Sequence, residues 1–271
     1  MCSTNKGVAM KPTREGAMRA SIGIVAGSGP EAGIDLWSKV LARNQTLFGE
    51  QFRGDLDAPR VVVLSEPTLG LSMDLQENED IVWHSLKQTV AAIAVQADAY
   101  AIACNTLNLF APRIASLGLP GEFVSFQSAL SAWVASNRVE RIALLGAAPV
   151  TSLGPWSAYR SLSDIVAIET PADPAELHNL ILDVKRLGSR DPSLRPRLQT
   201  LVESLTSDHV ILACTELPLI SDIETSKRLI DVTDLVAREL VDRSLAGAQG
   251  MAQSPDRVAD LQGQASAARA Q

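Results

Sequence analysis

The feature that most constrains the fold is one pattern that occurs at two distant places in the chain. Residues 101–107 read Ala-Ile-Ala-Cys-Asn-Thr-Leu, and residues 211–217 read Ile-Leu-Ala-Cys-Thr-Glu-Leu. Each segment is an apolar run that ends in Ala-Cys, two polar residues and Leu. A fainter pair precedes them, since residues 22–30 and 142–149 are each an apolar run that breaks into a loop of small residues. The repeat indicates two similar halves, each with a cysteine where a strand ends.

Short apolar runs alternate with longer segments of helical period between these repeats. The runs expected to be strands are residues 22–26, 61–64, 100–103, 123–126, 141–145, 165–168, 210–213 and 229–232. Strands that alternate with helices form parallel sheets with helices on both faces. The sequence therefore predicts an α/β fold of two pseudo-symmetric domains, each a mostly parallel sheet. Because ligands of such folds bind beyond the carboxyl ends of the strands, we expect the ligand site where the two cysteines lie.

The domain boundaries follow from the end of this alternation. We expect a mobile N-terminal tail at residues 1–20 and a mobile C-terminal tail at residues 246–271, because neither segment shows a sustained period. Residues 122–220 are expected to form the second domain. The first domain then comprises residues 21–121 together with 221–245, because a last strand and helix over 229–245 fit as its closing elements.

Four residues mark expected helix ends. Pro30 suits a first helical turn, where its missing N–H costs nothing. Asn78 can cap the next helix, and Asp173 begins a capping box in the second domain. Gly188 is expected to end the helix that Asp173 begins.

Composition argues against several classes of partner. The chain has 24 Lys and Arg against 31 Asp and Glu, a net charge of -7, and no basic cluster, so nucleic acid is not expected. No apolar stretch reaches the ~20 residues that cross a bilayer, so we expect no membrane partner. No secretory leader is recognisable, which favours a cytoplasmic location. The three histidines show no metal-ligand spacing, so no metal site is expected.

The cysteines are the candidates for chemistry. Cys2, Cys104 and Cys214 are too few for a disulfide framework, and we expect reduced thiols. A single buried cysteine after a strand is usually a core residue, but equivalent positions in two halves favour a catalytic pair. Inversion of a carbon centre without a cofactor requires a base on one face and an acid on the other. We expect a helix N-terminus to lower the pKa of each thiol toward neutrality.

The polar residues that follow the sulfurs are the candidates for substrate binding. Asn105 and Thr106 follow the first cysteine, and Thr215 and Glu216 follow the second. Their N–H and hydroxyl donors can hold a carboxylate and the negative charge that develops on it. Glu216 and Asp35 are also candidates to orient a sulfur or a substrate amine.

Together these motifs resemble the aspartate/glutamate racemase superfamily, closest to its aspartate racemase branch. The resemblance covers about residues 21–245, and its motifs lie at 27–32, 103–106, 213–217 and 229–233. It implies two pseudo-symmetric α/β domains with the active site between them, a small-molecule amino-acid substrate, no pyridoxal phosphate or other cofactor, and frequent homodimers. It also implies that Cys104 and Cys214 are the two acid/base residues, with Asn105, Thr106 and Thr215 near the substrate carboxylate.

The chain departs from the family pattern around the first pocket. Ser28 stands where the family usually has Met, and Leu107-Asn108 stands where Ala-His is common. The usual Gly-Thr pair of the second domain is replaced, and Thr151 is a possible substitute. We therefore expect Ser28 and Thr151 to contact the substrate in an altered pocket.

The charged positions of the family pattern also differ. The arginine expected after the second strand has no counterpart in residues 66–75. Arg186 matches a family lysine in position and charge, so one contact to a side-chain carboxylate is expected to remain. A site without a second bidentate partner loses much of its preference for a dicarboxylate. The sequence thus predicts an amino-acid racemase with weak selectivity for aspartate.

Three alternatives stay open. Residues 27–32 also fit the fingerprint of a dinucleotide-binding oxidoreductase, although no acidic residue ends a second strand at the usual distance. Other members of the same fold, such as maleate isomerase, hydantoin racemase or arylmalonate decarboxylase, use one or both cysteines. The last alternative is a binding protein that keeps the cleft without turnover.

Overall fold

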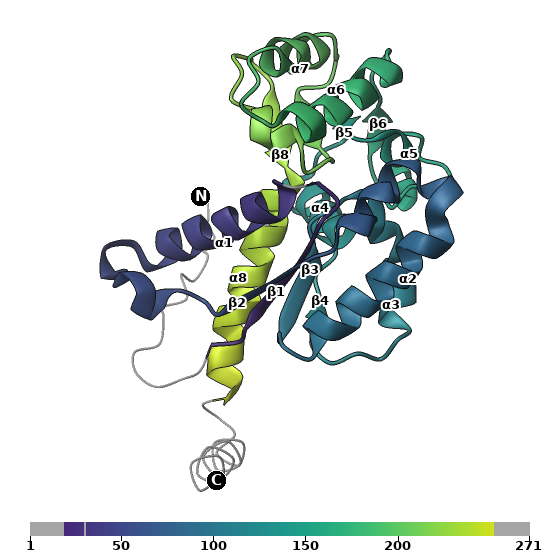
Figure 1. Ribbon diagram of the computed structural model, residues 1–271. Coiled ribbons are helices and arrows are strands. Elements are labelled where there is room, and N and C mark those ends of the chain that lie inside the picture. Colours follow the sequence, from purple (N-terminus) through teal and green to yellow (C-terminus); the bar gives the residue numbers. More distant parts are fainter. Residues whose placement is uncertain (1–18, 30, 252–271) are drawn as a thin grey trace, which may run out of the picture.

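A computed structural model describes residues 19–29 and 31–251 of the chain, and within them the strands form two parallel sheets of four strands each (Figure 1). The first sheet has the order β2-β1-β3-β4 and the second β6-β5-β7-β8. The strands of the first sheet are β1 (Ile22–Ala26), β2 (Val61–Ser65), β3 (Ala99–Ile102) and β4 (Glu122–Phe123). Those of the second sheet are β5 (Arg141–Leu145), β6 (Ala167–Glu169), β7 (His209–Leu212) and β8 (Arg228–Asp231). The shared order confirms the predicted fold of two pseudo-symmetric α/β halves.

The helices follow the strands as the alternation predicts. They are α1 (Ala32–Phe48), α2 (Leu75–Ala94), α3 (Ala111–Ala115), α4 (Phe126–Asn137), α5 (Ala148–Thr151), α6 (Pro174–Leu187), α7 (Leu194–Glu203) and α8 (Val232–Met251). Short 3₁₀ turns lie between them: η1 (Gly49–Gln51), η2 (Gly54–Asp57), η3 (Pro67–Asp74), η4 (Thr106–Phe110), η5 (Arg160–Asp164) and η6 (Leu217–Ile220). No helix in the described part of the chain is long and apolar enough to cross a membrane.

Alternate side chains of each strand enter different cores, as the pleat requires. In β1, Ile22 and Ile24 pack with α1 and α8, whereas Val25 packs with α2 on the other face. In β5, Ile142 and Leu144 face the core that contains α4, whereas Ala143 and Leu145 face α6 and α7. One core cluster contains residues of both sheets together with α1, α4 and α8. The two halves are therefore joined by a continuous apolar core.

The last strand corrects one expectation. The segment predicted at 229–232 does not belong to the first sheet, because Leu229 and Ile230 pair with Val210 and Ile211 of β7. Beside β7 this strand occupies the position that β4 occupies beside β3, so the repeat extends to the fourth strand. The chain returns to the first half only with α8, which packs along α1 and also contacts α4 (Figure 1). The other boundaries stay a prediction: a first domain of residues 21–121 plus 221–245, and a second domain of residues 122–220.

Several helix ends were also predicted. The Asp173 carboxylate accepts a hydrogen bond from the backbone of Glu176 at 2.9 Å, and Gly188 ends α6 with a φ of 83°, both as expected. Two boundaries were wrong: α2 begins at Leu75 and is kinked at Asn78, and the predicted strand at 123–126 ends at Phe123 because α4 begins at Phe126. Residue 30 lies outside the described residues, as do most of the two predicted tails, while α8 continues to Met251.

Candidate active site

Each candidate cysteine follows the third strand of its half. Cys104 comes after β3 and Cys214 after β7, and these strands occupy equivalent positions in the two sheets. Both thiols are free and almost fully buried, with Cys104 6% and Cys214 7% exposed. The loops that follow the carboxyl ends of the strands carry the polar residues around them.

Hydroxyl groups surround the Cys104 sulfur. The Ser28 hydroxyl, from the loop after β1, donates a hydrogen bond to Cys104 Sγ at 3.2 Å. Ser72, from η3, places its Oγ 2.8 Å from Ser28 Oγ and 3.8 Å from the sulfur. Hydrogen-bond donors that are held beside a sulfur can stabilise negative charge that develops on it. These contacts suit Cys104 to act as a base.

The partner of Cys214 is a hydrogen-bond acceptor, whereas the Ser28 partner of Cys104 is a donor. Its thiol donates a hydrogen bond to Glu216 Oε2 at 2.9 Å, and Thr215 donates to the same oxygen at 3.3 Å. Burial and then the Glu216 charge raise the pKa of Cys214 well above its ordinary value, although Lys185 opposes this. The expected lowering of the thiol pKa by a helix N-terminus is therefore wrong for Cys214. Only the short turn η6 follows it, and burial and a neighbouring carboxylate outweigh the local N–H groups.

Lys185 connects the surroundings of the two cysteines. It lies in the last turn of α6, where its Nζ is 3.0 Å from Glu216 Oε1 and donates to the Ser28 carbonyl at 2.9 Å. Burial disfavours the Lys185 charge, but Glu216, Cys214 and Cys104 raise its pKa overall. Both thiols thus interact electrostatically with one ammonium group.

A buried tyrosine contacts the residue that follows Cys104. The Tyr159 hydroxyl donates to Asn105 Oδ1 at 2.5 Å. Burial and then the charges of Cys104 and Cys214 raise the pKa of Tyr159 well above its ordinary value. The amide nitrogen of Asn105 is buried and has no hydrogen-bond partner among the described residues. Asn105 therefore has a donor available for a ligand.

Asn108 fixes the backbone of the same loop. Its Nδ2 donates to the Cys104 carbonyl at 2.8 Å, and its Oδ1 accepts from the Phe126 backbone at 2.9 Å. The amide thus ties the cysteine loop to the start of α4. These two hydrogen bonds explain why a polar residue is buried at this position.

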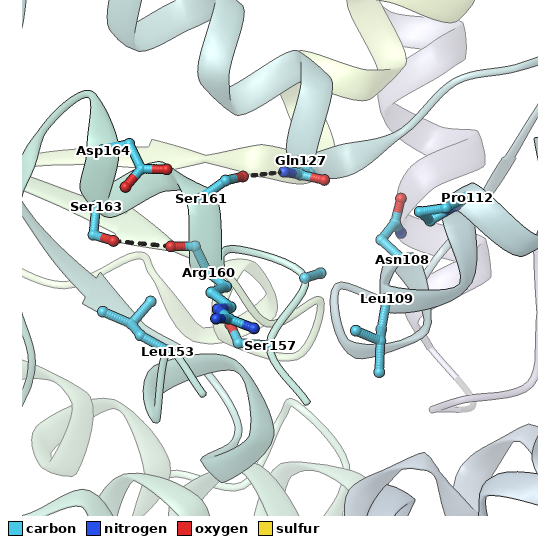
Figure 2. Close-up of a pocket in the computed structure, with 11 residues that line it drawn as sticks. Asn108, Leu109, Pro112, Gln127, Leu153, Ser157, Arg160, Ser161, Ser163 and Asp164 are labelled. Carbon is cyan, nitrogen blue, oxygen red and sulfur yellow. Dashed lines mark hydrogen bonds between the residues drawn. The ribbon is translucent and has the colours of Figure 1, made fainter. Parts of the chain in front are cut away.

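Two cavities adjoin these loops. A cavity of about 140 Å³ is lined by Glu31, Val184, Lys185, Gly188, Glu216 and Leu219, and so touches the carboxylate that contacts Cys214. A larger cavity of about 500 Å³ lies between the loop after β3 and the loop after β5. Figure 2 shows Asn108, Leu109 and Pro112 on one side of it and Ser157 and Arg160 on the other. Neither cysteine lines the larger cavity, whereas the smaller one adjoins the Cys214 partner.

The structure brings most of the predicted site residues together. Ser28 contacts Cys104, Thr215 contacts the Cys214 partner, and Asn105 and Thr106 are buried directly after Cys104. Thr151 is buried too, but its hydroxyl donates to the Ala147 carbonyl of its own turn at 3.4 Å.

Two of the predicted residues make their contacts elsewhere. The Arg186 side chain is 73% exposed and pairs with Asp183 at 2.8 Å, so it faces away from the cysteines. Asp35 pairs with Lys39 instead of a sulfur. Lys185, one residue earlier, contacts Glu216 and Ser28 beside the cysteines, and the helical period could have identified it. It lies four residues after the buried Ile181, whereas Arg186 is turned about 100° further around the helix.

The comparisons with known proteins agree with this architecture. The model of the Asp/Glu/hydantoin racemase family matches residues 25–240. The chain belongs to this family. Its members include racemases, and membership supports a racemase-like enzymatic function for this chain. A search of curated proteins finds no match.

Solved structures of racemases share the family fold. Aspartate racemase from Picrophilus torridus aligns with a TM-score of 0.69 and 20% identity, over 83% of this chain and 94% of that one. An aspartate racemase homologue from Pyrococcus horikoshii OT3 aligns with a TM-score of 0.61 and 22% identity, over 83% and 99% of the two chains. Glutamate racemase from Campylobacter jejuni subsp. jejuni gives 0.57 and 18%, over 82% and 85%. At these identities the likeness shows the fold of the Asp/Glu/hydantoin racemase family.

Proposed function

We propose that the chain is a cofactor-independent amino-acid racemase in which Cys104 and Cys214 transfer protons on opposite faces of the substrate α-carbon. The observation that carries this proposal is the pairing of the two thiols with partners of opposite kind. Ser28 donates to Cys104 at 3.2 Å, whereas Glu216 accepts from Cys214 at 2.9 Å. One sulfur is prepared to accept a proton, and the other holds a proton that it can give.

Each half of the reaction follows from these contacts. The Cys104 thiolate takes the α-proton, and the electron pair of the broken C–H bond spreads into the substrate carboxylate. The Cys214 thiol then gives its proton to the opposite face of the α-carbon. Cys104 now carries a proton and Cys214 a negative charge, so the opposite enantiomer reacts with the roles exchanged. Side chains perform both proton transfers, and the reaction needs no pyridoxal phosphate or metal.

The substrate carboxylate needs donors where its charge grows during the reaction. The free amide N–H of Asn105 is a buried donor beside Cys104. Thr106 starts η4, and Thr215 directly follows Cys214, two residues before η6. Donors that are held in place before the reaction stabilise such a charge at little further cost. We therefore assign carboxylate binding to these three residues.

The charged groups around the thiols favour a substrate without a second carboxylate. Lys185 is already paired with Glu216 and bonded to the Ser28 carbonyl, and Arg186 faces solvent. A dicarboxylate needs a further cation, which neither residue offers. We propose amino acids with uncharged side chains as the preferred substrates.

The remaining features of the proposal rest on the sequence. Reduced catalytic thiols favour a cytoplasmic location, and the family resemblance favours a homodimer. The main competing function is isomerisation or decarboxylation of another small carboxylic acid. The sequence leaves it open because maleate isomerase and arylmalonate decarboxylase are members of the same fold that use one or both cysteines.

A panel of single amino-acid enantiomers, followed by chiral chromatography, tests the function. We expect racemisation of uncharged amino acids, at least tenfold faster than that of aspartate. Cys104→Ala and Cys214→Ala should each abolish net racemisation, because each interrupts proton delivery in both directions. Cys2→Ala is the matched control and should keep the wild-type rate. Racemisation by either variant at a near wild-type rate would contradict the two-thiol mechanism, and conversion of aspartate alone would contradict the proposed substrate class.

A further inference from the structure

Lys185 joins segments from both halves of the molecule. It belongs to α6 of the second half, and its ammonium donates to the carbonyl of Ser28 in the loop after β1 of the first half at 2.9 Å. The same ammonium lies 3.0 Å from Glu216, in the loop after β7. The side chain of Lys185 is only 16% exposed and that of Glu216 only 4%.

Both contacts of Lys185 lead to a sulfur. Ser28, whose carbonyl accepts from Lys185, donates its hydroxyl to Cys104 at 3.2 Å. Glu216, whose Oε1 pairs with Lys185, accepts the Cys214 thiol on its Oε2 at 2.9 Å. A single ammonium therefore holds the direct hydrogen-bond partner of each thiol.

We propose that Lys185 is a positioning residue for both thiols, which holds Ser28 against Cys104 and Glu216 against Cys214. This inference rests on the proposed function only in so far as the two sulfurs are the reacting groups. It assigns Lys185 to the organisation of the acid/base pair, and not to a substrate carboxylate.

The backbone next to Ser28 is shaped for this arrangement. Gly29 has a φ of 123°, a backbone conformation that residues with a side chain rarely adopt. A Cβ at Gly29 would lie 2.0 Å from Glu216 Oε1 and 3.4 Å from Lys185 Nζ. The chain at Gly29 thus passes directly against the Lys185–Glu216 ion pair, where only glycine fits.

Stability alone is a poor explanation for the ion pair. Burying two charges costs about as much as their attraction returns, so a buried pair is weak evidence for a stabilising role. The charges of Cys104 and Cys214 act on Lys185 and raise its pKa, and the interaction is mutual. The Lys185 ammonium therefore attracts a negative charge on either sulfur.

The test measures the two thiols separately. Iodoacetamide is applied to the full chain over a range of pH, and mass spectrometry of peptides gives the alkylation rates of Cys104 and Cys214. The charged and titratable groups that face Cys214 are Glu216, Lys185 and Tyr159. We expect Lys185→Met to slow alkylation of both thiols about tenfold at fixed pH and to move both midpoints upward, since one pKa unit is a tenfold change in thiolate.

Further variants separate positioning from general loss of structure. Lys185→Arg should restore much of the alkylation rate of both thiols. Glu216→Gln should accelerate alkylation of Cys214, because the Glu216 carboxylate raises the pKa of that thiol. Lys39→Met is the matched control, because Lys39 is 21% exposed and pairs with Asp231 at 3.1 Å. It should leave both thiol rates unchanged. If Lys185→Met fails to fold, Lys185→Met with Glu216→Gln replaces the pair by neutral groups, and slow alkylation of Cys104 is still expected.

Clear results would overturn the proposal. It fails if Lys185→Met slows only one thiol, if its rates equal those of Lys39→Met, or if Lys185→Arg is no better than Lys185→Met. It also fails if the folded double variant alkylates Cys104 at the wild-type rate or if Glu216→Gln slows Cys214. Alkylation requires no turnover. The expected rates in a protein that does not racemise any amino acid would therefore support the role of Lys185 while contradicting the proposed function.

Discussion

At the scale of single residues, the orientation of Asn105 depends on one hydroxyl group. Tyr159 donates to Asn105 Oδ1, which leaves the amide N–H of Asn105 for a ligand. Tyr159→Phe should lower the free energy of unfolding by about 1–3 kcal/mol, because it leaves a buried acceptor without a donor. The variant should also have a higher KM for the amino-acid substrate, because the Asn105 side-chain amide can then rotate. Chemical denaturation and steady-state kinetics measure the two effects.

Tyr100→Phe is the matched control for this change. Tyr100 is also buried, and its hydroxyl makes no hydrogen bond within the part of the chain that the structure describes. The control should alter stability by less than about 0.5 kcal/mol, because no buried partner is lost. Equal losses in the two variants would show that the Tyr159–Asn105 bond does not matter.

The residues of the site differ in how far the sequence could predict them. The two cysteines follow from the repeat, and Asn105 and Thr215 follow from their places beside the sulfurs. Lys185 could have been found from the period of α6, in preference to its neighbour Arg186. No local pattern indicates that Tyr159 meets Asn105, because the loop after β5 and the loop after β3 come together only in the folded chain.

At the scale of elements, most strands could be predicted because apolar runs and turns are local signals. All of the predicted runs overlap an observed strand, and β1 and β5 have the predicted bounds. The wrong assignment of β8 has a physical cause: a short apolar run does not specify its neighbour. Its pairing with β7 depends on contacts between segments that are separated by a loop and a turn.

One carboxylate joins the end of β6 to the segment before β7, and its contribution to stability depends on pH. Glu169, at the end of β6, accepts hydrogen bonds from the backbone and hydroxyl groups of Thr206 and Ser207. Burial opposes its charge, but these hydrogen bonds lower the pKa of Glu169 to about 2. Because the folded pKa is lower than the unfolded one, the stabilisation is fully present above the unfolded pKa and is lost as the pH falls toward 2.

Glu169→Gln should therefore be less stable than the wild type at pH 6. The difference between the two free energies of unfolding should shrink as the pH falls from about 5 to 2. Denaturant titrations at a series of pH values measure it. A difference that is constant with pH would show that the charge of Glu169 contributes nothing.

At the scale of the whole molecule, the repeat predicted two halves but not how they meet. The core that joins both sheets draws on α1, α4 and α8, which lie far apart in the sequence. The candidate site is built in the same way, with Ser28 and Cys104 from the first half and Lys185, Cys214 and Glu216 from the second. Its proposed chemistry therefore requires both halves to hold their thiols on opposite faces of one substrate.

Isotope exchange tests that central claim most directly. In D₂O, Cys104→Ala should exchange the α-proton of only one enantiomer, the one whose hydrogen faces Cys214, without inverting it. Cys214→Ala should exchange only the other enantiomer, and the wild type should place deuterium on the product enantiomer. Proton NMR of each pure enantiomer follows the loss of the α-signal. Opposite preferences in the two variants are the result that two facing thiols predict, and the same preference in both would contradict it.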